Sequence, residues 1–243
     1  MAAELSGPSD SPRSARESLP GPPDEAIEVF GGALDQAQRY ARRLATDGVA
    51  RGLIGPRETG RLWDRHLLNC AVVAELLPER GLLVDIGSGA GLPGVVLAML
   101  RPSLEVVLLE PLLRRSVFLE ECVAELRLAN VTVVRARAEE KAAARIKADV
   151  ATARAVAPLD RLADWAARLL RPGGELLAIK GQSAEEEIAA ARPALARLDA
   201  RSAEVLQAGQ GRVVIATTIV RVVFGGHGRE ERAGAQRSRR GVA

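Results

Sequence analysis

The chain has 243 residues, and 47% of them are hydrophobic, which is enough for one substantial domain with extensions but not for two full domains. The formal net charge is +3, and the five Arg and two Glu between positions 225 and 243 account for all of it, so overall charge gives no argument for nucleic-acid binding. With three Phe, two Trp and one Tyr, the composition argues against an aromatic platform on which RNA bases would stack.

The first 23 residues are rich in Ser, Pro and Gly and lack a continuous apolar segment, so they are predicted to be a disordered leader and not a signal peptide. No window approaches the length of a transmembrane helix, which predicts a soluble, cytoplasmic protein without a membrane partner. Cys70 and Cys122 stand alone in apolar helical contexts, as buried cysteines do in a reducing cytoplasm. The two histidines, His66 and His227, are too far apart to anchor a metal, so no metal is expected.

Residues 24–80 are predicted to form an N-terminal helical extension. Apolar positions between 24 and 46 have the spacing of one or two amphipathic helices, and a second helix is expected over about 58–77. Within this second helix the run RLWDRHLLN places five polar residues within two and a half turns: Arg61, Asp64, Arg65, His66 and Asn69. These residues form either a solvated helix face or a surface that faces an anionic substrate. Arg61 and Arg65 favour the second interpretation, because they carry the same charge one helical turn apart and repel each other slightly.

A buried strand, a tight turn and a helix start lie along residues 82–94, which read LLVDIGSGAGLPG. Glycines at positions 87, 89 and 91 allow the backbone to take positive φ angles and to approach a ligand without a Cβ in the way. Pro93 suits the first turn of a helix, where its missing N–H costs nothing. The free amides of this turn are therefore expected to face a ligand beyond the end of the strand.

The same stretch matches the G-x-G-x-x-G pattern of dinucleotide-binding proteins at Gly89, Gly91 and Gly94, a match that is weak on its own. Asp85 argues against a dinucleotide, because a carboxylate just before the loop would repel a pyrophosphate; it would suit a ligand with an ammonium group and no phosphate. Glu110, at the end of the next strand, could accept both hydroxyls of a ribose. These features favour S-adenosylmethionine over NAD, and an empty structural turn is a third interpretation.

Beyond this loop, apolar runs alternate with helical segments, which predicts parallel strands joined by right-handed crossovers. Helices are expected from Pro111, over about 159–170, and after Ser183 as N-cap, with Pro193 kinking or ending the last one. A turn is expected at 172–174 and a terminal hairpin around 208–211. The predicted fold class is α/β: a seven-stranded, mostly parallel, doubly wound sheet over residues 81–224, followed by a disordered basic tail over 225–243.

Several residues fall where the predicted parallel strands end, at the edge of the sheet that the glycine turn also occupies. Ala138 and Glu139 end the third strand, Arg154 ends the fourth and Lys180 ends the fifth. Arg154 is the most informative, because an arginine at the end of a central strand must point into a pocket or be paired there.

The ordered motifs RLWDRHLLN, VDIGSGAGLPG, LLEPLLRRSVFL, RAEE, ARAVAPL and LLAIKG resemble the glucose-inhibited division protein B family. Those proteins are methyltransferases that form 7-methylguanosine in the decoding-region loop of bacterial 16S ribosomal RNA. The resemblance spans about residues 57–181, half the chain. It implies a class I methyltransferase fold, S-adenosyl-L-methionine as cofactor, and 16S ribosomal RNA or the small ribosomal subunit as partner.

The resemblance also implies roles for single residues. Leu92 closes the methionine-binding turn, Glu110 stands where many relatives have a ribose-binding Asp, and Ala153 replaces a serine before the arginine that follows strand four. The expected cofactor-binding residues are Asp85, Gly87, Gly89, Gly91, Leu92, Glu110, Ala138, Glu139 and Arg154.

The implied reaction needs no catalytic acid or base, because the N7 nitrogen of guanine has a free lone pair; catalysis is then mainly alignment, with Arg154 as a positioning residue. The candidate RNA contacts are Arg61, Arg65, His66, Asn69, Arg114, Arg115 and Lys180. For Arg114 and Arg115 a solvated helix face is the alternative. Three other functions stay open at this point: a small-molecule methyltransferase, an NAD-dependent oxidoreductase and a non-catalytic RNA-binding module.

Overall fold

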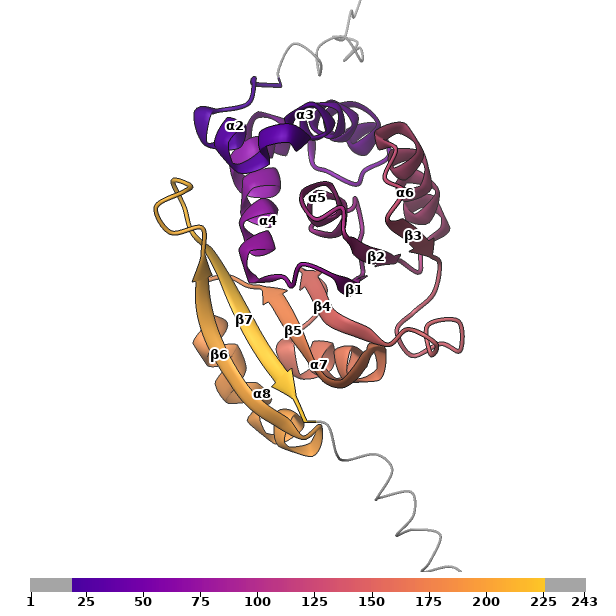
Figure 1. Cartoon of the computed structure of the whole chain (residues 1–243), viewed down its shortest axis with the longest axis vertical. Coiled ribbons are helices and arrows are strands. Elements are labelled where there is room, and N and C mark those ends of the chain that lie inside the picture. Colours follow the sequence, from indigo (N-terminus) through magenta and orange to yellow (C-terminus); the bar gives the residue numbers. More distant parts are fainter. Residues whose placement is uncertain (1–18, 226–243) are drawn as a thin grey trace, which may run out of the picture.

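The computed structural model describes residues 19–225, in which seven strands form one sheet with the order β3-β2-β1-β4-β5-β7-β6 (Figure 1). The strands are β1 (Gly81–Ile86), β2 (Leu104–Leu109), β3 (Val131–Val134), β4 (Ala148–Arg154), β5 (Leu170–Ile179), β6 (Ala200–Ala208) and β7 (Thr217–Phe224). The first five run parallel, whereas β7 pairs antiparallel with both β5 and β6. The prediction of a seven-stranded, mostly parallel sheet with a terminal hairpin is confirmed.

Two separate apolar cores cover the two faces of the sheet. One core includes α7 (Leu159–Leu169) and α8 (Ala184–Arg197), and the other includes α5 (Gly94–Leu100), α6 (Leu113–Leu126) and the N-terminal helices. Figure 1 shows α7 and α8 on the opposite side of the sheet from α5 and α6. Central strands buried on both faces read as continuous apolar runs, which is why β1 and β4 were visible in the sequence.

The N-terminal extension is a run of short helices that packs on the same face as α5 and α6. Its segments are α2 (Asp24–Phe30), η1 (Gly31–Ala33), α3 (Leu34–Arg43), η2 (Leu44–Gly48), η3 (Pro56–Arg61), η4 (Leu62–Leu68), α4 (Asn69–Ala71) and η5 (Val72–Leu76). Fully buried side chains of this extension, including Tyr40, Leu44 and Leu62, belong to the same core as the sheet residue Leu83. The extension and the sheet therefore share one interior.

The predicted second helix over 58–77 is present but is not a regular α-helix. It begins as a 3₁₀ turn, continues as a π-helix over Leu62–Leu68 and ends in a second 3₁₀ segment. Five of the seven π-helical residues are buried, which is wider than the single apolar stripe of an α-helix. The motif that carries Arg65 and His66 lies on this π-helical segment.

Three local predictions differ from the structure in the second half of the sheet. The glycine-rich turn at 172–174 lies inside β5, where the register to β4 shifts between Ala148 and Val150. Ser183 makes no side-chain cap bond, and α8 continues through Pro193 to Arg197. Pro193 lies on the exposed side of α8, so the carbonyl that loses its partner stays accessible to water while the buried side of the helix still packs.

Two segment boundaries also differ. Helix α6 begins at Leu113, two residues after Pro111, and the connection within the terminal hairpin is longer than the predicted turn at 208–211, because β6 ends at Ala208 and β7 begins only at Thr217. Gly209 has a φ of 79° and donates its amide to Glu75 Oε1 at 2.8 Å, so the chain turns toward the extension before it enters β7. Val214 and Ile215 in this loop are 86% and 76% exposed.

The chain ends bear on two further predictions. Residues 19–23, the last part of the predicted leader, contact the extension: Trp63 Nε1 donates to the carbonyl of Pro20 at 3.0 Å, and Leu19 packs against the core. Residues 1–18 and the predicted basic tail from 226 onward lie outside the described residues. None of the helices between residues 19 and 225 combines the length and apolar character that crossing a membrane requires.

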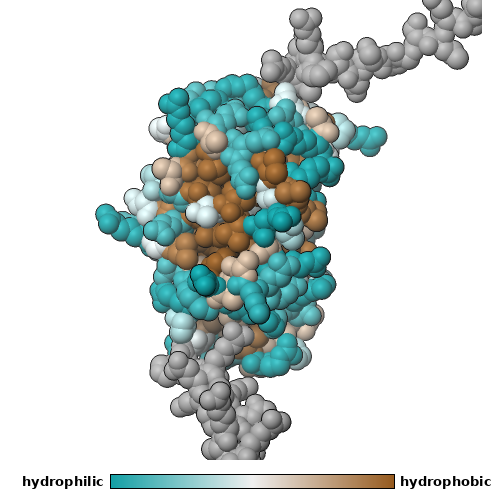
Figure 2. Space-filling model, turned by 90° about the vertical axis from the view of Figure 1, so that its right-hand side faces the viewer, coloured by the Kyte–Doolittle hydropathy of each residue, from teal (hydrophilic) through white to brown (hydrophobic). Residues whose placement is uncertain are grey.

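Apolar side chains are not confined to the interior. Figure 2 shows a face on which apolar side chains gather near the centre, with polar side chains around them. The large apolar side chains that are exposed in the described part of the chain are Ile27, Leu112, Leu113, Val117, Val214 and Ile215.

Candidate functional site

The loop after β1 is held close to the two neighbouring strands. The amides of Gly87 and Ser88 donate to the carbonyl of Leu109 at the end of β2, at 2.8 and 3.1 Å. Gly87 has a φ of 66°, and a Cβ at this position would lie 3.0 Å from Val156 Cγ1 in the loop after β4. Glycine is therefore required at position 87 both for the backbone angle and for the approach of the β4 loop.

The extension contacts this loop from the other side. Tyr40 is fully buried on α3 and donates its hydroxyl to the carbonyl of Ala90 at 2.6 Å; burial raises the pKa of this hydroxyl well above its usual value. Gly91 has a φ of 98°, and a Cβ there would lie 2.6 Å from Val95 Cγ2 and 2.7 Å from Tyr40 Oη. No sequence pattern indicates this contact, since Tyr40 and Ala90 are 50 positions apart.

Asp85 does not face the ligand side of the loop, contrary to the expectation from sequence. Its side chain is fully buried, and it accepts hydrogen bonds from the Gly94 amide at 3.1 Å and from the Thr152 hydroxyl at 3.2 Å. Burial raises the pKa of this carboxyl to about 7. Asp85 therefore joins the end of β1 to the start of α5 and to β4, beneath the loop.

A cavity of about 540 Å³ lies beyond the loop, and we call it the glycine-loop cavity. Seven of the nine predicted cofactor-binding residues line it: Gly87, Gly89, Leu92, Glu110, Ala138, Glu139 and Arg154. Asp85 and Gly91 do not line it. Ala138 and Glu139 reach it from the loop after β3, because β3 ends at Val134 and not at Glu139 as predicted.

Glu110 forms part of the wall of the glycine-loop cavity, and it is 1% exposed. Its Oε2 accepts the Gly89 amide at 2.9 Å and its Oε1 accepts the Leu112 amide at 3.0 Å. A carboxylate offers about four acceptor positions, so two remain for a ligand. The Arg115 guanidinium lies 3.9 Å from Glu110 Oε2 and also lines this cavity. Arg114 does not line it.

A second, larger cavity of about 1470 Å³ adjoins the first, and we call it the outer cleft. Five of the predicted RNA contacts line it: Arg61, Arg65, His66, Asn69 and Lys180. The exposed residues Val214 and Ile215, in the loop between β6 and β7, also line it. The predicted contacts are thus brought together, with the exception of Arg114 and Arg115.

The outer cleft contains both signs of charge, and two of the four arginine and lysine side chains that line it are paired with carboxylates. Lys180 Nζ contacts Glu187 Oε2 at 2.6 Å, and Arg65 Nη1 lies 3.5 Å from Glu58 Oε1. Asn69 donates its amide to the Thr217 hydroxyl at 2.7 Å, which ties α4 to the start of β7. Arg61 and Arg154 are the cleft cations that have no carboxylate within 4.0 Å among residues 19–225.

Arg154 stands where the two cavities meet, and it lines both. Its Nη1 donates to the carbonyl of Arg65 at 3.3 Å and to Cys70 Sγ at 3.4 Å, and its Nη2 donates to Nδ1 of His66. His66 Nε2 lies 2.9 Å from Glu58 Oε2. Burial, and then the neighbouring Arg154 charge, lower the pKa of His66, so the ring is neutral at pH 7.

Glu58, which was not among the predicted site residues, also lines both cavities. It lies on η3, outside the helical spacing that singled out the RLWDRHLLN motif, so no sequence signal pointed to it. Its pKa is lowered, first because it hydrogen-bonds His66.

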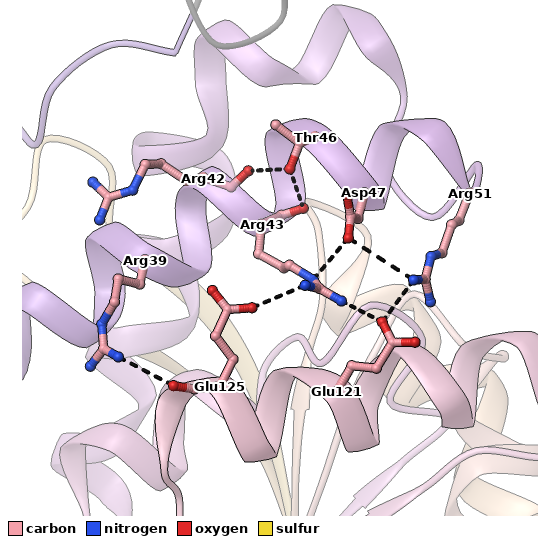
Figure 3. A network of polar contacts seen from close by, with 8 residues as sticks. All are labelled: Arg39, Arg42, Arg43, Thr46, Asp47, Arg51, Glu121 and Glu125. Carbon is pink, nitrogen blue, oxygen red and sulfur yellow. Dashed lines mark hydrogen bonds and ion pairs between the residues drawn. The ribbon is translucent and has the colours of Figure 1, made fainter. Parts of the chain in front are cut away.

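A network of charges fastens α6, which follows Glu110, to the extension (Figure 3). Arg51 Nη2 lies 2.7 Å from Glu121 Oε2, and Arg43 contacts Glu121 and also Glu125 Oε2 at 3.1 Å. Both guanidinium groups lie over the ring of Phe118, at 5.8 Å for Arg43 and 5.6 Å for Arg51. The extension thus contacts two elements that line the glycine-loop cavity: the glycine loop, through Tyr40, and α6, through this network.

The chain matches a known protein family over most of its length. A family model described as rRNA small subunit methyltransferase G matches residues 33–215. The chain belongs to this family. The Thermobifida fusca ribosomal RNA small subunit methyltransferase G is 62% identical over 201 residues, which cover 83% of this chain and 84% of the relative. The Streptomyces coelicolor protein of the same name is 55% identical over 212 residues, covering 87% and 89%.

Solved structures agree on the fold. An S-adenosylmethionine-dependent O-methyltransferase from Thermotoga maritima superposes with a TM-score of 0.52 at 16% identity, covering 67% of each chain. M. jannaschii TYW2 in complex with AdoMet superposes with a TM-score of 0.53 at 17% identity, covering 68% of this chain and 78% of that one. The resemblance inferred from the motifs is confirmed, and the chain belongs to a family of rRNA methyltransferases and not of NAD-dependent oxidoreductases. Clusters of three or more His, Cys, Asp or Glu that could hold a metal do not occur within 19–225.

Proposed function

We propose that this protein transfers the methyl group of S-adenosylmethionine to N7 of a guanine in the decoding-region loop of 16S ribosomal RNA. The observation that carries the proposal is the meeting of two cavities at Arg154: one is formed by the glycine loop and Glu110, and the other is more than twice as large. A ribosomal RNA substrate places the protein in the cytoplasm, with 16S ribosomal RNA or the small subunit as its partner.

The residues of the glycine-loop cavity fit the cofactor. The two acceptor positions that the backbone leaves free on Glu110 suit the paired hydroxyls of a ribose. The side chains of Ala136, Ala138 and Leu109 offer an apolar wall for an adenine ring. When bound, S-adenosylmethionine supplies a methyl group that is already activated by its positively charged sulfur.

The outer cleft suits a macromolecule better than a small metabolite. Its volume of about 1470 Å³ exceeds the range of roughly 300–1,000 Å³ that small-molecule pockets occupy. Arg61 and Arg154 present charge that the described residues do not neutralise, which suits phosphate or base oxygens of RNA. Val214 and Ile215 add an exposed apolar surface that a base can contact once it leaves its stack.

The reaction asks the protein for alignment and not for proton transfer. Guanine N7 has a free lone pair, so no base has to remove a proton before attack. The titratable groups at the junction agree: His66 is neutral and engaged by Arg154 and Glu58, and Cys70 is buried with a pKa raised to about 11. The role left for these side chains is to hold the nucleotide and the cofactor in line.

Methyl transfer to isolated ribosomal RNA and to small subunits tests the proposal directly. Unmodified RNA is incubated with the protein and methyl-labelled S-adenosylmethionine, and the labelled fragment is located by nuclease digestion and mass spectrometry. We expect one added methyl group, on a guanine of the decoding-region loop, and a loss of transfer in Arg154→Ala that is much larger than its loss of stability. Label that appears in a small-molecule fraction and not in RNA would support the small-molecule alternative.

A further inference from the structure

The strongest unexplained feature is the chain of contacts that runs from Glu58 through His66 to Arg154. Glu58 lies on η3, His66 on the π-helical segment η4, and Arg154 at the end of β4, so the chain joins the extension to the sheet. All three residues line both cavities. The sequence had indicated His66 as an RNA contact, but the structure directs both of its ring nitrogens to protein side chains.

The contacts determine which nitrogen of His66 carries the proton. An arginine side chain has donors and no acceptor, so Nδ1 of His66 must be unprotonated to accept from Arg154 Nη2. The neutral ring then carries its proton on Nε2, which donates to the Glu58 carboxylate at 2.9 Å. Glu58 can only accept when ionised, so it selects this tautomer and no other.

The guanidinium of Arg154 needs such a support. It has no carboxylate partner within 4.0 Å in the described part of the chain, and its other contacts are a carbonyl and a neutral thiol. The long side chain is half-buried and reaches the place where cofactor and RNA would meet. A misplacement of the order of 1 Å at such a point costs about a hundredfold in rate.

We propose that Glu58 and His66 are positioning residues for methyl transfer: Glu58 holds His66 in its Nε2–H tautomer, and Nδ1 of His66 fixes the guanidinium of Arg154 at the junction of the two cavities. This inference rests on the proposed function, because it concerns the substrate end of the same site. Neither Glu58 nor His66 has to contact the reacting atoms.

Kinetics separate positioning from a structural role. His66→Ala removes the acceptor, and we expect the methyl-transfer rate at saturating RNA and cofactor to fall by about a hundredfold. His66→Asn keeps an acceptor oxygen near the place of Nδ1, so the rate should recover to within about tenfold of the wild type. In an Arg154→Ala background, His66→Ala should add less than about a threefold loss, because the group that it positions is already gone.

The ring nitrogens can be observed without any substrate. The chain has two histidines, so nitrogen NMR of the imidazoles gives only two sets of signals, and His66→Asn identifies those of His66. We expect a protonated Nε2 and an unprotonated Nδ1 at pH 7.5. Three charged groups face this ring: Glu58, Arg65 and Arg154. Arg154→Ala should therefore raise the pKa of His66, and Glu58→Gln should lower it.

The outcomes distinguish a failure of the proposed function from a failure of the positioning role of Glu58 and His66. If the wild type does not methylate ribosomal RNA, the proposed function fails, while the NMR result still decides whether the contact chain exists. If the wild type is active, the inference is overturned by a protonated Nδ1, by a wild-type rate in His66→Ala, by equal rates in His66→Ala and His66→Asn, or by additive losses in the Arg154→Ala background. Should His66→Ala fail to fold, the His66→Asn variant and the wild-type spectrum make the same decision.

Discussion

Replacing Gly91 with alanine tests whether the extension holds the glycine loop in place. The native φ of 98° lies outside the angles that alanine adopts readily, and such backbone strain costs about 1–3 kcal/mol. The added Cβ would also lie 2.6 Å from Val95 Cγ2 and 2.7 Å from Tyr40 Oη, and overpacking of this kind costs about 1–3 kcal/mol. We therefore expect Gly91→Ala to lower the free energy of unfolding by about 2–6 kcal/mol.

Gly89→Ala is the matched control in the same loop. Gly89 has a φ of 58°, but the nearest atom to an added Cβ is the carbonyl oxygen of Gly87 at 3.8 Å, which is ordinary contact. Strain alone should then lower the free energy of unfolding by about 1–2 kcal/mol. The amide that Gly89 donates to Glu110 is kept in this variant.

Urea denaturation at pH 7.5, with a shared slope for all variants, measures the two losses, and titration calorimetry measures cofactor affinity. Gly91→Ala should lose clearly more stability than Gly89→Ala, and the double variant Tyr40→Phe, Gly91→Ala should lose less than the sum of its parts, because the removed hydroxyl frees space. Equal losses for the two glycine variants would refute the close packing on which this reasoning depends.

Three further predictions concern other sites. Burial raises the pKa of Asp85 from 3.8 to about 7, so the folded protein retains a proton that the unfolded chain loses between these pH values, and about 4 kcal/mol of stability should be lost as pH rises from 3.8 to 7. Denaturation measured from pH 4 to 8 should show this loss in the wild type and not in Asp85→Asn. Glu121→Gln should lower stability by about 1 kcal/mol in dilute salt, and by less in 1 M NaCl, when thermal unfolding is compared. Ile215→Ser should raise KM for ribosomal RNA, whereas the cofactor Kd by calorimetry stays unchanged; a changed Kd would contradict the assignment of this loop to RNA.

The fold was predictable because its signals are local. Each central strand is a short apolar run, the glycine turn marks the end of β1, and Glu110 follows β2 directly. The topological rules for parallel strands then place these positions at one edge of the sheet. For the same reason the sequence indicated Arg154, which ends β4, as a residue of the site.

The parts that the sequence did not reveal depend on contacts between distant segments. Tyr40 meets Ala90 across 50 positions, and Glu58 becomes important only because Arg154 lies beside His66, 88 positions further along. Lys180 was predicted to contact RNA, but in the fold Glu187 on α8 forms an ion pair with it. The direction of the Asp85 side chain was misjudged because it depends on where α5 begins, and the Gly94 amide and the Thr152 hydroxyl attract the carboxylate away from the cavity.

The interior that the N-terminal helices share with the sheet has a consequence for how such enzymes diverge and how they can be recombined. Tyr40 fills the space that a side chain at position 91 would need, and the residues that reach the junction of the cavities come from both parts of the chain. If the N-terminal helices of one family member replaced those of another, their residues at positions 40, 58 and 66 would have to fit the glycine turn and the strand-end arginine of the recipient. The two parts are therefore constrained to evolve together.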